Sequence, residues 1–323
     1  DLEQIALQYA RETDQFWTNI PQATFLRNPD GSWVTQEGDP VSLTESVFGF
    51  PWQLPAGLPD GPYRLRAVTR CKTLGSYASA IVRGSIDRTA PRVFGHPWPT
   101  DGILSAGDDI KVEFTEQVDC AALSSDRFEM RDVVTGVQIP VDFLCNFNGT
   151  QVVLSPRGLS PADMRGHTYQ MTIPGAVKVN NVERGVRDMS GNVLQKSVSW
   201  AFYAGDSAVT WQTPIAVTSL NLGEAGVIQT SIGNSSPQPV SFTIDSLPPW
   251  LEVTPPSGII PAGGSLSITL TVSGGLGAGD FSAVIFATMT TIPGTVNGDR
   301  SPASASGLAP RIPLSVAVTV GAG

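Results

Sequence analysis

The sequence has little charge and few residues suited to catalysis. Charged residues occupy 15% of the 323 positions, and there are two histidines and three cysteines. The formal net charge of −9 leaves no excess of basic residues for phosphate groups, so nucleic acid is not expected as a partner. No run of 18 apolar residues occurs, and we therefore expect no direct membrane insertion.

Motifs for known catalytic or cofactor sites are also missing. No Gly-x-Ser-x-Gly elbow accompanies His96 or His167, and no glycine-rich phosphate loop is followed by the required lysine. The cysteines form no Cys-x-x-Cys pair of the kind that favours zinc. The side chains at predicted turns that offer oxygens to calcium are Asp101, Asp108, Asp188 and Asn192. Because Asp and Asn also stabilise turns, and no loop concentrates six oxygens, we expect no metal, no cofactor and no enzyme activity.

Glycine and proline are abundant instead, with 33 and 26 residues. Both weaken helices and favour the tight turns between short strands. Apolar and polar residues alternate in Tyr63–Val68, Ile110–Phe114 and Leu314–Val320, which predicts strands with one buried face. A single helical turn is predicted at 160–164, with Ser160 as its N-cap. Many short strands bounded by turns predict an all-β chain of tandem sandwiches.

Two linkers that contain proline or glycine divide the chain. They lie at Ile86–Pro91 and Tyr203–Ser207, and they predict modules at residues 1–87, 88–204 and 205–323. The first module is expected to be a partial sandwich, because the sequence starts directly in a predicted strand. A missing partner strand would leave an unpaired edge, to which another segment can add.

The second module contains a series of motifs at its turns and strand ends. They are Asp87-Arg88-Thr89-Ala90-Pro91, Pro99-Thr100-Asp101-Gly102, Phe114-Thr115-Glu116-Gln117-Val118 and Asp188-Met189-Ser190-Gly191-Asn192, before a last strand through Trp200 and Phe202. This module resembles bacterial immunoglobulin-like domains of the surface-layer and giant-adhesin type. The resemblance implies a β-sandwich and supplies no catalytic residue.

The third module carries Leu247-Pro248-Pro249-Trp250-Leu251 through Gly258, followed by Pro261-Ala262-Gly263-Gly264. On these residues it resembles the immunoglobulin-like modules known as BACON domains. The first module is similar only in outline to fibronectin type III, through the turn and tyrosine at Leu58–Tyr63. Together the resemblances imply three tandem immunoglobulin-like or fibronectin III-like sandwiches of a giant extracellular surface or filament protein.

Cys120 and Cys145 fall near strand ends of the same module, so we expect a disulfide between them. Two buried free thiols are the alternative, and Cys71 is then the odd cysteine, with no partner assigned. Two sequons, Asn148-Gly149-Thr150 and Asn234-Ser235-Ser236, lie in predicted turns where a glycan could be tolerated. Chance occurrence without a glycan is the alternative at both positions.

The expected function is structural and adhesive, in an adhesin, a stalk or an extracellular filament similar to a flagellar hair at the cell surface. The expected partners are other modules of the same protein, neighbouring subunits and glycans. The third module supports this, because it holds only six acidic and two basic residues and can be buried with little loss of ion solvation. The alternative is an accessory glycan-binding module of a secreted enzyme or receptor.

Overall fold

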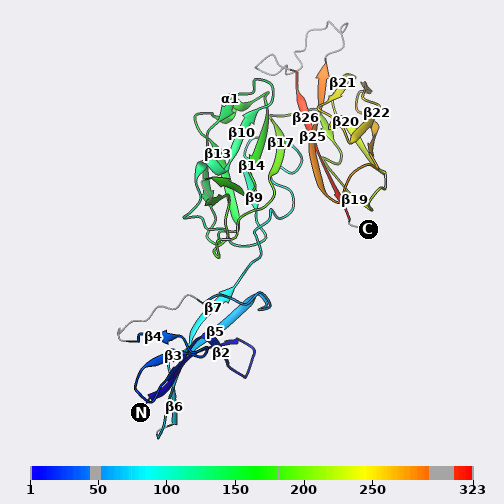
Figure 1. The fold of residues 1–323 in the computed structure, drawn as a ribbon. Coiled ribbons are helices and arrows are strands. Elements are labelled where there is room, and N and C mark those ends of the chain that lie inside the picture. Colours follow the sequence, from blue (N-terminus) through cyan, green and yellow to red (C-terminus); the bar gives the residue numbers. More distant parts are fainter. Residues whose placement is uncertain (1, 44–51, 74, 180–181, 291–308, 322–323) are drawn as a thin grey trace. The chain divides into compact units, whose positions relative to one another are not determined.

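The computed structural model describes residues 2–43, 52–73, 75–179, 182–290 and 309–321 (Figure 1). Strands dominate these residues, and the helical elements among them are α1 (Pro161–Met164) and the 3-10 turn η1 (Ser125–Arg127). The all-β prediction is therefore confirmed. The chain separates into two compact units, Asp1–Thr89 and Ala90–Gly323, called unit 1 and unit 2 below.

The described residues of unit 1 form one seven-stranded sheet in the order β4-β3-β2-β1-β5-β6, with β7 also pairing with β5. The strands are β1 (Leu2–Arg11), β2 (Thr18–Arg27), β3 (Trp33–Thr35), β4 (Pro40–Val41), β5 (Gly61–Cys71), β6 (Gly75–Ala78) and β7 (Val82–Ile86). This single sheet occupies the region where the sequence predicts a partial sandwich.

The two faces of this sheet differ in chemistry. On one face the ring of Tyr9 packs against Trp52, with 4.9 Å between the ring centroids. On the other, the guanidinium groups of Arg64 and Arg66 lie 5.2 Å and 4.1 Å from the Trp17 ring centroid. Cation–π contacts of this kind stabilise arginine at a partly exposed surface.

Tyr63, near the start of β5, holds the turn that precedes this strand. The hydroxyl of Tyr63 donates to the carbonyl of Pro59, four residues earlier, at 2.8 Å. A tyrosine that bonds back to the preceding turn is typical of immunoglobulin-like sandwiches, where it fixes the entry to a late strand.

Unit 2 contains two sandwiches, here called the middle and the last sandwich. The middle sandwich has a five-stranded sheet, β11-β10-β14-β17-β8, opposite a three-stranded sheet, β12-β13-β9, and a small ribbon, β15-β16. Its strands are β8 (Ile103–Leu104), β9 (Ile110–Glu113), β10 (Glu129–Asp132), β11 (Gln138–Ile139), β12 (Val141–Cys145), β13 (Gln151–Pro156), β14 (Thr168–Ile173), β15 (Val177–Val179), β16 (Val182–Arg184) and β17 (Val198–Ala204). Trp200 and Phe202 of β17 are fully buried in its core.

The last sandwich packs a four-stranded sheet, β18-β20-β24-β22, on a five-stranded sheet, β19-β26-β25-β21-β23. Its strands are β18 (Val209–Trp211), β19 (Ile215–Leu220), β20 (Gly226–Asn234), β21 (Val240–Asp245), β22 (Leu251–Thr254), β23 (Ser257–Ile260), β24 (Ser265–Val272), β25 (Gly279–Thr290) and β26 (Arg311–Val320). The predicted module boundaries at 87 and 205 fall between strands, after β7 and after β17.

The helical turn forms where its sequence predicts. Ser160 Oγ accepts a hydrogen bond from the Asp163 amide, and Asp163 Oδ2 accepts one from the Ser160 amide at 2.9 Å. Pro161 stands in the first turn, where its missing N–H has no partner to lose. This reciprocal cap confirms Ser160 as the N-cap.

Strand β26 contributes to both sandwiches, because successive side chains of a strand point to opposite faces. Its even-numbered residues, Ile312, Leu314, Val316, Val318 and Val320, are at most 4% exposed and fill the last sandwich. On the other face, Ser315 Oγ lies 3.2 Å from His96 Nε2. The carbonyl of Arg311 accepts a hydrogen bond from Thr168 Oγ1 at 2.7 Å.

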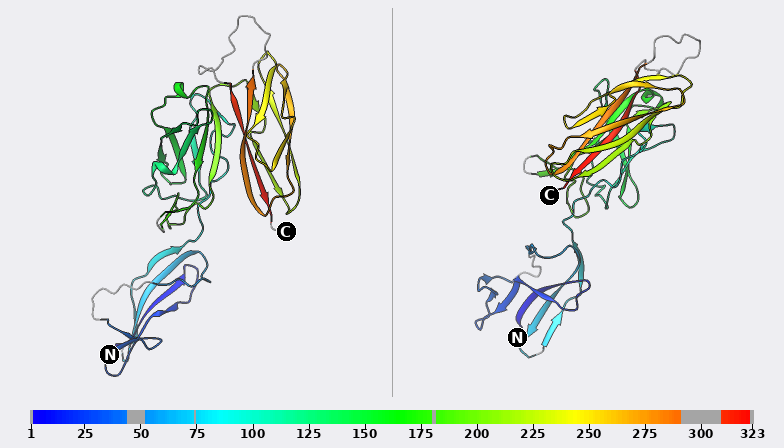
Figure 2. Two further views of the ribbon diagram at one scale, coloured as in Figure 1. Left: turned by 45° about the horizontal axis from the view of Figure 1, so that its top comes forward. Right: turned by 90° about the vertical axis from the view of Figure 1, so that its right-hand side faces the viewer.

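Apolar side chains of the middle sandwich also join the core of the last one. Ile103 of β8 and Tyr203 of β17 are buried within the same hydrophobic cluster as the even-numbered residues of β26. Figure 2 shows β17 and β26 side by side along this contact. The two sandwiches of unit 2 are therefore packed through a shared hydrophobic layer.

One glycine of the middle sandwich, Gly102, lies directly against β26 of the last sandwich. Gly102 has φ +75°, and an added Cβ would lie 3.3 Å from Pro313 Cγ. Gly107, in the turn after β8, has φ +96° and no atom within 4 Å of such a Cβ. We expect Gly102→Leu to cost about 1–3 kcal/mol more of unfolding free energy than Gly107→Leu, because only the former overpacks against β26. Both variants also place a side chain at a positive φ, which is unfavourable at either position.

Urea unfolding of the full chain with each variant measures this difference. Equal losses in Gly102→Leu and Gly107→Leu would show that the contact with Pro313 does not limit the packing of the two sandwiches.

Candidate functional site

The structure brings Cys120 and Cys145 together in a disulfide with an S–S distance of 2.08 Å. Cys145 ends β12, and Cys120 lies in the segment that follows the isolated bridge at Val118. Both side chains pack against the core of the middle sandwich. Cys71, at the end of β5 in unit 1, is a half-buried free thiol. The disulfide fastens an irregular segment of the middle sandwich to its smaller sheet.

The two sequons lie in different environments. Asn148 is exposed in the turn between β12 and β13. Asn234 is 2% exposed, and its Nδ2 donates to the carbonyls of Gln238 at 2.7 Å and Pro261 at 3.2 Å. A glycan would replace one of the two hydrogens on that nitrogen and would have to fit where the side chain is buried. The structure places Asn234 at the end of β20, where its buried amide holds the turn that follows the strand.

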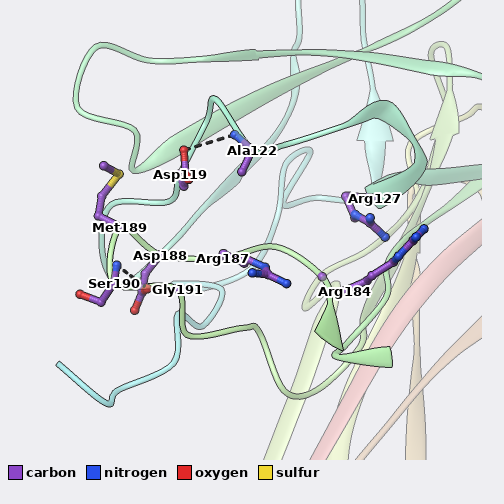
Figure 3. Close-up of a pocket in the computed structure, with 10 residues that line it drawn as sticks. Asp119, Ala122, Arg127, Arg184, Arg187, Asp188, Met189, Ser190 and Gly191 are labelled. Atoms are coloured by element: carbon purple, nitrogen blue, oxygen red, sulfur yellow. Dashed lines mark hydrogen bonds between the residues drawn. The ribbon is translucent and has the colours of Figure 1, made fainter. Parts of the chain in front are cut away.

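A pocket of about 400 Å³ opens on the middle sandwich, beside the disulfide segment (Figure 3). The residues that line it are Asp119, Ala122, Arg127, Arg184, Gly185, Arg187, Asp188, Met189, Ser190 and Gly191. They come from the segment after Val118, from η1, from β16 and from the loop after β16. Three arginines at one pocket stand out in a chain with an acidic net charge of −9.

The wall formed by residues 188–192 is held by Asp188. Its Oδ1 accepts the amides of Ser190 and Asn192, each at 2.8 Å, and its Oδ2 accepts Asn192 Nδ2 at 2.7 Å. Asp188 is 2% exposed, so these bonds satisfy a carboxylate that lies away from solvent. Gly191 completes the turn with φ +90°, a conformation that side chains other than glycine rarely adopt. The Asp-x-x-Gly-Asn motif thus acts as a structural turn.

The opposite wall is held in a similar way. Asp119 Oδ1 accepts the amides of Ala121 at 3.1 Å and Ala122 at 3.2 Å, next to the disulfide at Cys120. The other two calcium candidates also bond within their own turns, Asp101 to the Ile103 amide and Asp108 to the Ser105 amide. Each of these carboxylates has the role of a turn-forming residue.

The arginines reach the pocket from separate segments. Arg127 is half-buried, and its Nη1 lies 3.6 Å from Asp126 Oδ2. Arg184 is exposed at the end of β16, and Arg187 is half-buried three residues later. Gly185 permits this path, because a Cβ there would lie 2.4 Å from Val193 Cγ1. In Figure 3 the three arginine side chains lie to the right of Met189, Ser190 and Gly191.

The two histidines have structural contacts. His167 Nδ1 lies 2.6 Å from Asp132 Oδ2, and its ring stacks on Tyr169 with 6.1 Å between the centroids. Burial alone would raise the pKa of Asp132, but hydrogen bonds from the Thr135 amide, His167 and the Val134 amide hold that pKa below its usual range. Burial, together with the charge of Asp132, raises the pKa of Tyr169 to about 12. Asp132, which accepts the Val134 and Thr135 amides, holds the turn between β10 and β11.

In the part of the chain that the structure describes, no helix is long and apolar enough to cross a membrane.

No protein-family model matches the chain, and no curated protein matches it by sequence. Solved structures share low similarity with it. A PapD-like domain of human CEP192 is 12% identical over 36% of this chain and 87% of its own, with a TM-score of 0.30. The N-terminal part of the bacterial S-layer protein SbsC is 14% identical over 71% and 44%, with a TM-score of 0.26. Dpr2 Ig1-Ig2 in complex with DIP-Theta Ig1-Ig3 is 10% identical over 100% and 94%, with a TM-score of 0.23. These values assign the chain to no family.

The disulfide should contribute to stability by restricting the unfolded chain. Its cysteines are 25 residues apart, and a loop of this size corresponds to about 3 kcal/mol. We expect the Cys120→Ser, Cys145→Ser double variant to lose about that much unfolding free energy in denaturant titrations. Cys71→Ser is the matched control and should change the value by less than about 0.5 kcal/mol. A double variant as stable as this control would contradict the expectation.

The buried side-chain amide of Asn234 should contribute to the unfolding free energy. Asn234→Ala leaves the Gln238 and Pro261 carbonyls without their donor, and we expect a loss of at least about 2 kcal/mol. Asn148→Ala, at the exposed sequon, should stay within about 0.5 kcal/mol of the parent chain. Chemical unfolding of both variants tests this difference, and similar stabilities would show that the Asn234 amide is dispensable.

Proposed function

We propose that the chain is a non-catalytic structural and adhesive array of modules in an extracellular protein, acting as a spacer and an assembly surface in an adhesin, stalk or filament. The observation that carries this proposal is the packing of β26 against both sandwiches of unit 2. The disulfide between Cys120 and Cys145 supports an oxidising, extracellular location.

A spacer needs a fixed length. The contact between the middle and last sandwiches favours a fixed length for unit 2. Tandem modules move relative to each other unless their interface is large and apolar. Here the core of the last sandwich includes Ile103 and Tyr203 of the middle one. Polar contacts surround this layer, with an ion pair between Lys196 and Asp280 and a hydrogen bond between His96 and Ser315. Two modules held in this way act as one stiff element.

The last sandwich offers a surface suited to assembly. Exposed apolar side chains lie on both of its sheets, with Val227 on β20 62% exposed, and Val217 and Ile259 on the two edge strands β19 and β23 64% and 57% exposed. The same module has few charged residues, so a neighbour can cover it with little loss of ion solvation. Neighbouring subunits or further modules of the same protein are the partners that this surface fits.

Stiffness can be measured in the full chain with spin labels on both sandwiches. Cysteines at Arg131, in β10, and Val217, in β19, place one exposed label on each sandwich in a Cys71→Ser background. Electron–electron double resonance should give a single narrow distance distribution. Adding Gly102→Leu, which crowds Pro313, should broaden it. A broad distribution without that substitution would contradict the spacer role.

Assembly is tested on the native surface of the source cells. Electron cryotomography with an antibody to this chain should show repeated, ordered copies, with the last sandwich against a neighbour. Contacts that together bury well under about 800 Å² on that sandwich would be no better than crystal contacts and would refute assembly.

A further inference from the structure

We propose that strand β6 of unit 1 pairs with β6 of a second copy of this chain, in an antiparallel ladder about a two-fold axis. This inference goes beyond the proposed function, whose assembly surface lies on the last sandwich, and it is independent of that surface. It rests on the exposure, the composition and the hydrogen-bonding direction of β6.

Strands β6 and β7 form one edge of the unit 1 sheet. Both pair with β5, and among the described residues no strand pairs with their outer side. Every residue from Gly75 to Ser85 is exposed. The main-chain N–H and C=O groups on the outer side of this edge are therefore open to a further strand.

The two edges of the sheet differ in their protection against pairing. Among the described residues the opposite edge is β4, which has two residues and begins with Pro40. On the side of β6, the sequence from Thr73 to Val82 contains no charged residue and no proline. Charges and prolines are common means by which natural proteins prevent an edge from pairing. Because β6 has neither, two copies of it can meet without like-charge repulsion.

The main chain of β6 directs alternate residues outward. The Ser79 amide donates to the Ala67 carbonyl at 2.9 Å, so these two residues bond across the ladder between β5 and β6. Bonded and non-bonded pairs alternate along an antiparallel ladder, so Tyr77 also bonds to β5. The main-chain groups of Ser76 and Ala78 therefore point away from β5 and toward the open side.

A bulge limits the new ladder to β6. Ala78 faces Val68 on β5, whereas Val82 faces Leu65, so the edge gains one residue between β6 and β7. An extra residue bends a strand and interrupts regular pairing. A second strand can therefore follow β6 and not the whole edge, and we expect a small interface with weak association.

The outward residues allow a symmetric register. Two antiparallel copies of β6 can place Ser76 of each opposite Ala78 of the other, and Tyr77 then lies opposite its own copy at the axis. Tyr77 is 58% exposed, and an aromatic pair directly across a ladder is favourable. Strand β6 is thus complementary to itself, which makes a second copy of this chain the partner that it fits.

Disulfide cross-linking of the full chain tests this register in a Cys71→Ser background. Tyr77→Cys should give a covalent dimer on mild oxidation, because Cβ atoms of opposite residues lie about 4.5–5.5 Å apart, near the distance that a disulfide spans. Val82→Cys is the matched control, since Val82 is 64% exposed on the same edge. In this register Val82 lies about 30 Å from its own copy and should cross-link at least about tenfold less.

Sedimentation equilibrium of the full chain tests the association without added thiols. At about 100 μM the parent chain should be partly dimeric. Tyr77→Lys and Tyr77→Glu should each weaken the dimer at least about tenfold, because like charges then face each other at the axis. An equimolar mixture of the two variants should recover the dimer. Val217→Lys, on β19 of the last sandwich, adds the same charge elsewhere and should leave the association within about twofold.

The outcomes separate this edge from the surface of the last sandwich. Recovery of the dimer in the mixture supports the proposal, because a variant that had lost its edge structure would not be rescued. A parent chain that stays monomeric would overturn the proposal, as would equal cross-linking of Tyr77→Cys and Val82→Cys. Loss of the dimer in Val217→Lys but not in Tyr77→Lys would also overturn it, and would support the assembly surface of the proposed function. Circular dichroism verifies that each variant is folded.

Discussion

The packing of unit 2 depends on the two faces of β26. Its alternating side chains place Ile312, Leu314 and Val316 in the core of the last sandwich. The intervening positions are left to contact the middle sandwich, where Thr168 and His96 provide polar partners. A one-residue slip in register would exchange the two faces and bury polar groups in the core. The same alternation therefore fixes the strand in its sheet and fixes one sandwich on the other.

Buried polar side chains have a second, more local role in this chain. Asp132, Asp188 and Asn234 are each at most 5% exposed, and each bonds to backbone groups of a nearby turn. Irregular backbone carries N–H and C=O groups that no strand partner satisfies, and a buried carboxylate or amide supplies the missing partner. The loops at the ends of the sandwiches are thus ordered from inside, and the pocket walls are one result.

The sequence predicts the parts of the fold that depend on local pattern. Alternation in Leu314–Val320 predicts a strand, and Ser160 followed by Pro161 predicts the helical cap, as the structure has them. The parallel pairing of β19 with β26 cannot be predicted from local pattern. It pairs Ile215 with Ser315, and these residues are separated in the sequence by most of the module. The burial of Asn234 has no local pattern either. Its sequon and the Ser-Ser-Pro that follows are typical of an exposed turn, whereas the partners of its amide include Pro261, on a distant loop. The sequence does not predict the arginine pocket for the same reason. Arg184 and Arg187 are close in the sequence, but nothing there indicates that Arg127 lies near them.

The place of β26 in the order of synthesis has a consequence for how unit 2 acquires its structure. This strand follows every other described strand in the sequence, yet it lies between β19 and β25 and is paired on both sides. While the polypeptide is being made, the residues of β19 and β25 precede those of β26, so the edges that pair with β26 are still unfilled. Pairing across so long a separation is slow because the intervening loop must close first. The last sandwich therefore lacks the strand that joins β19 to β25 until residues 311–320 have been made, and the same strand completes its contact with the middle sandwich.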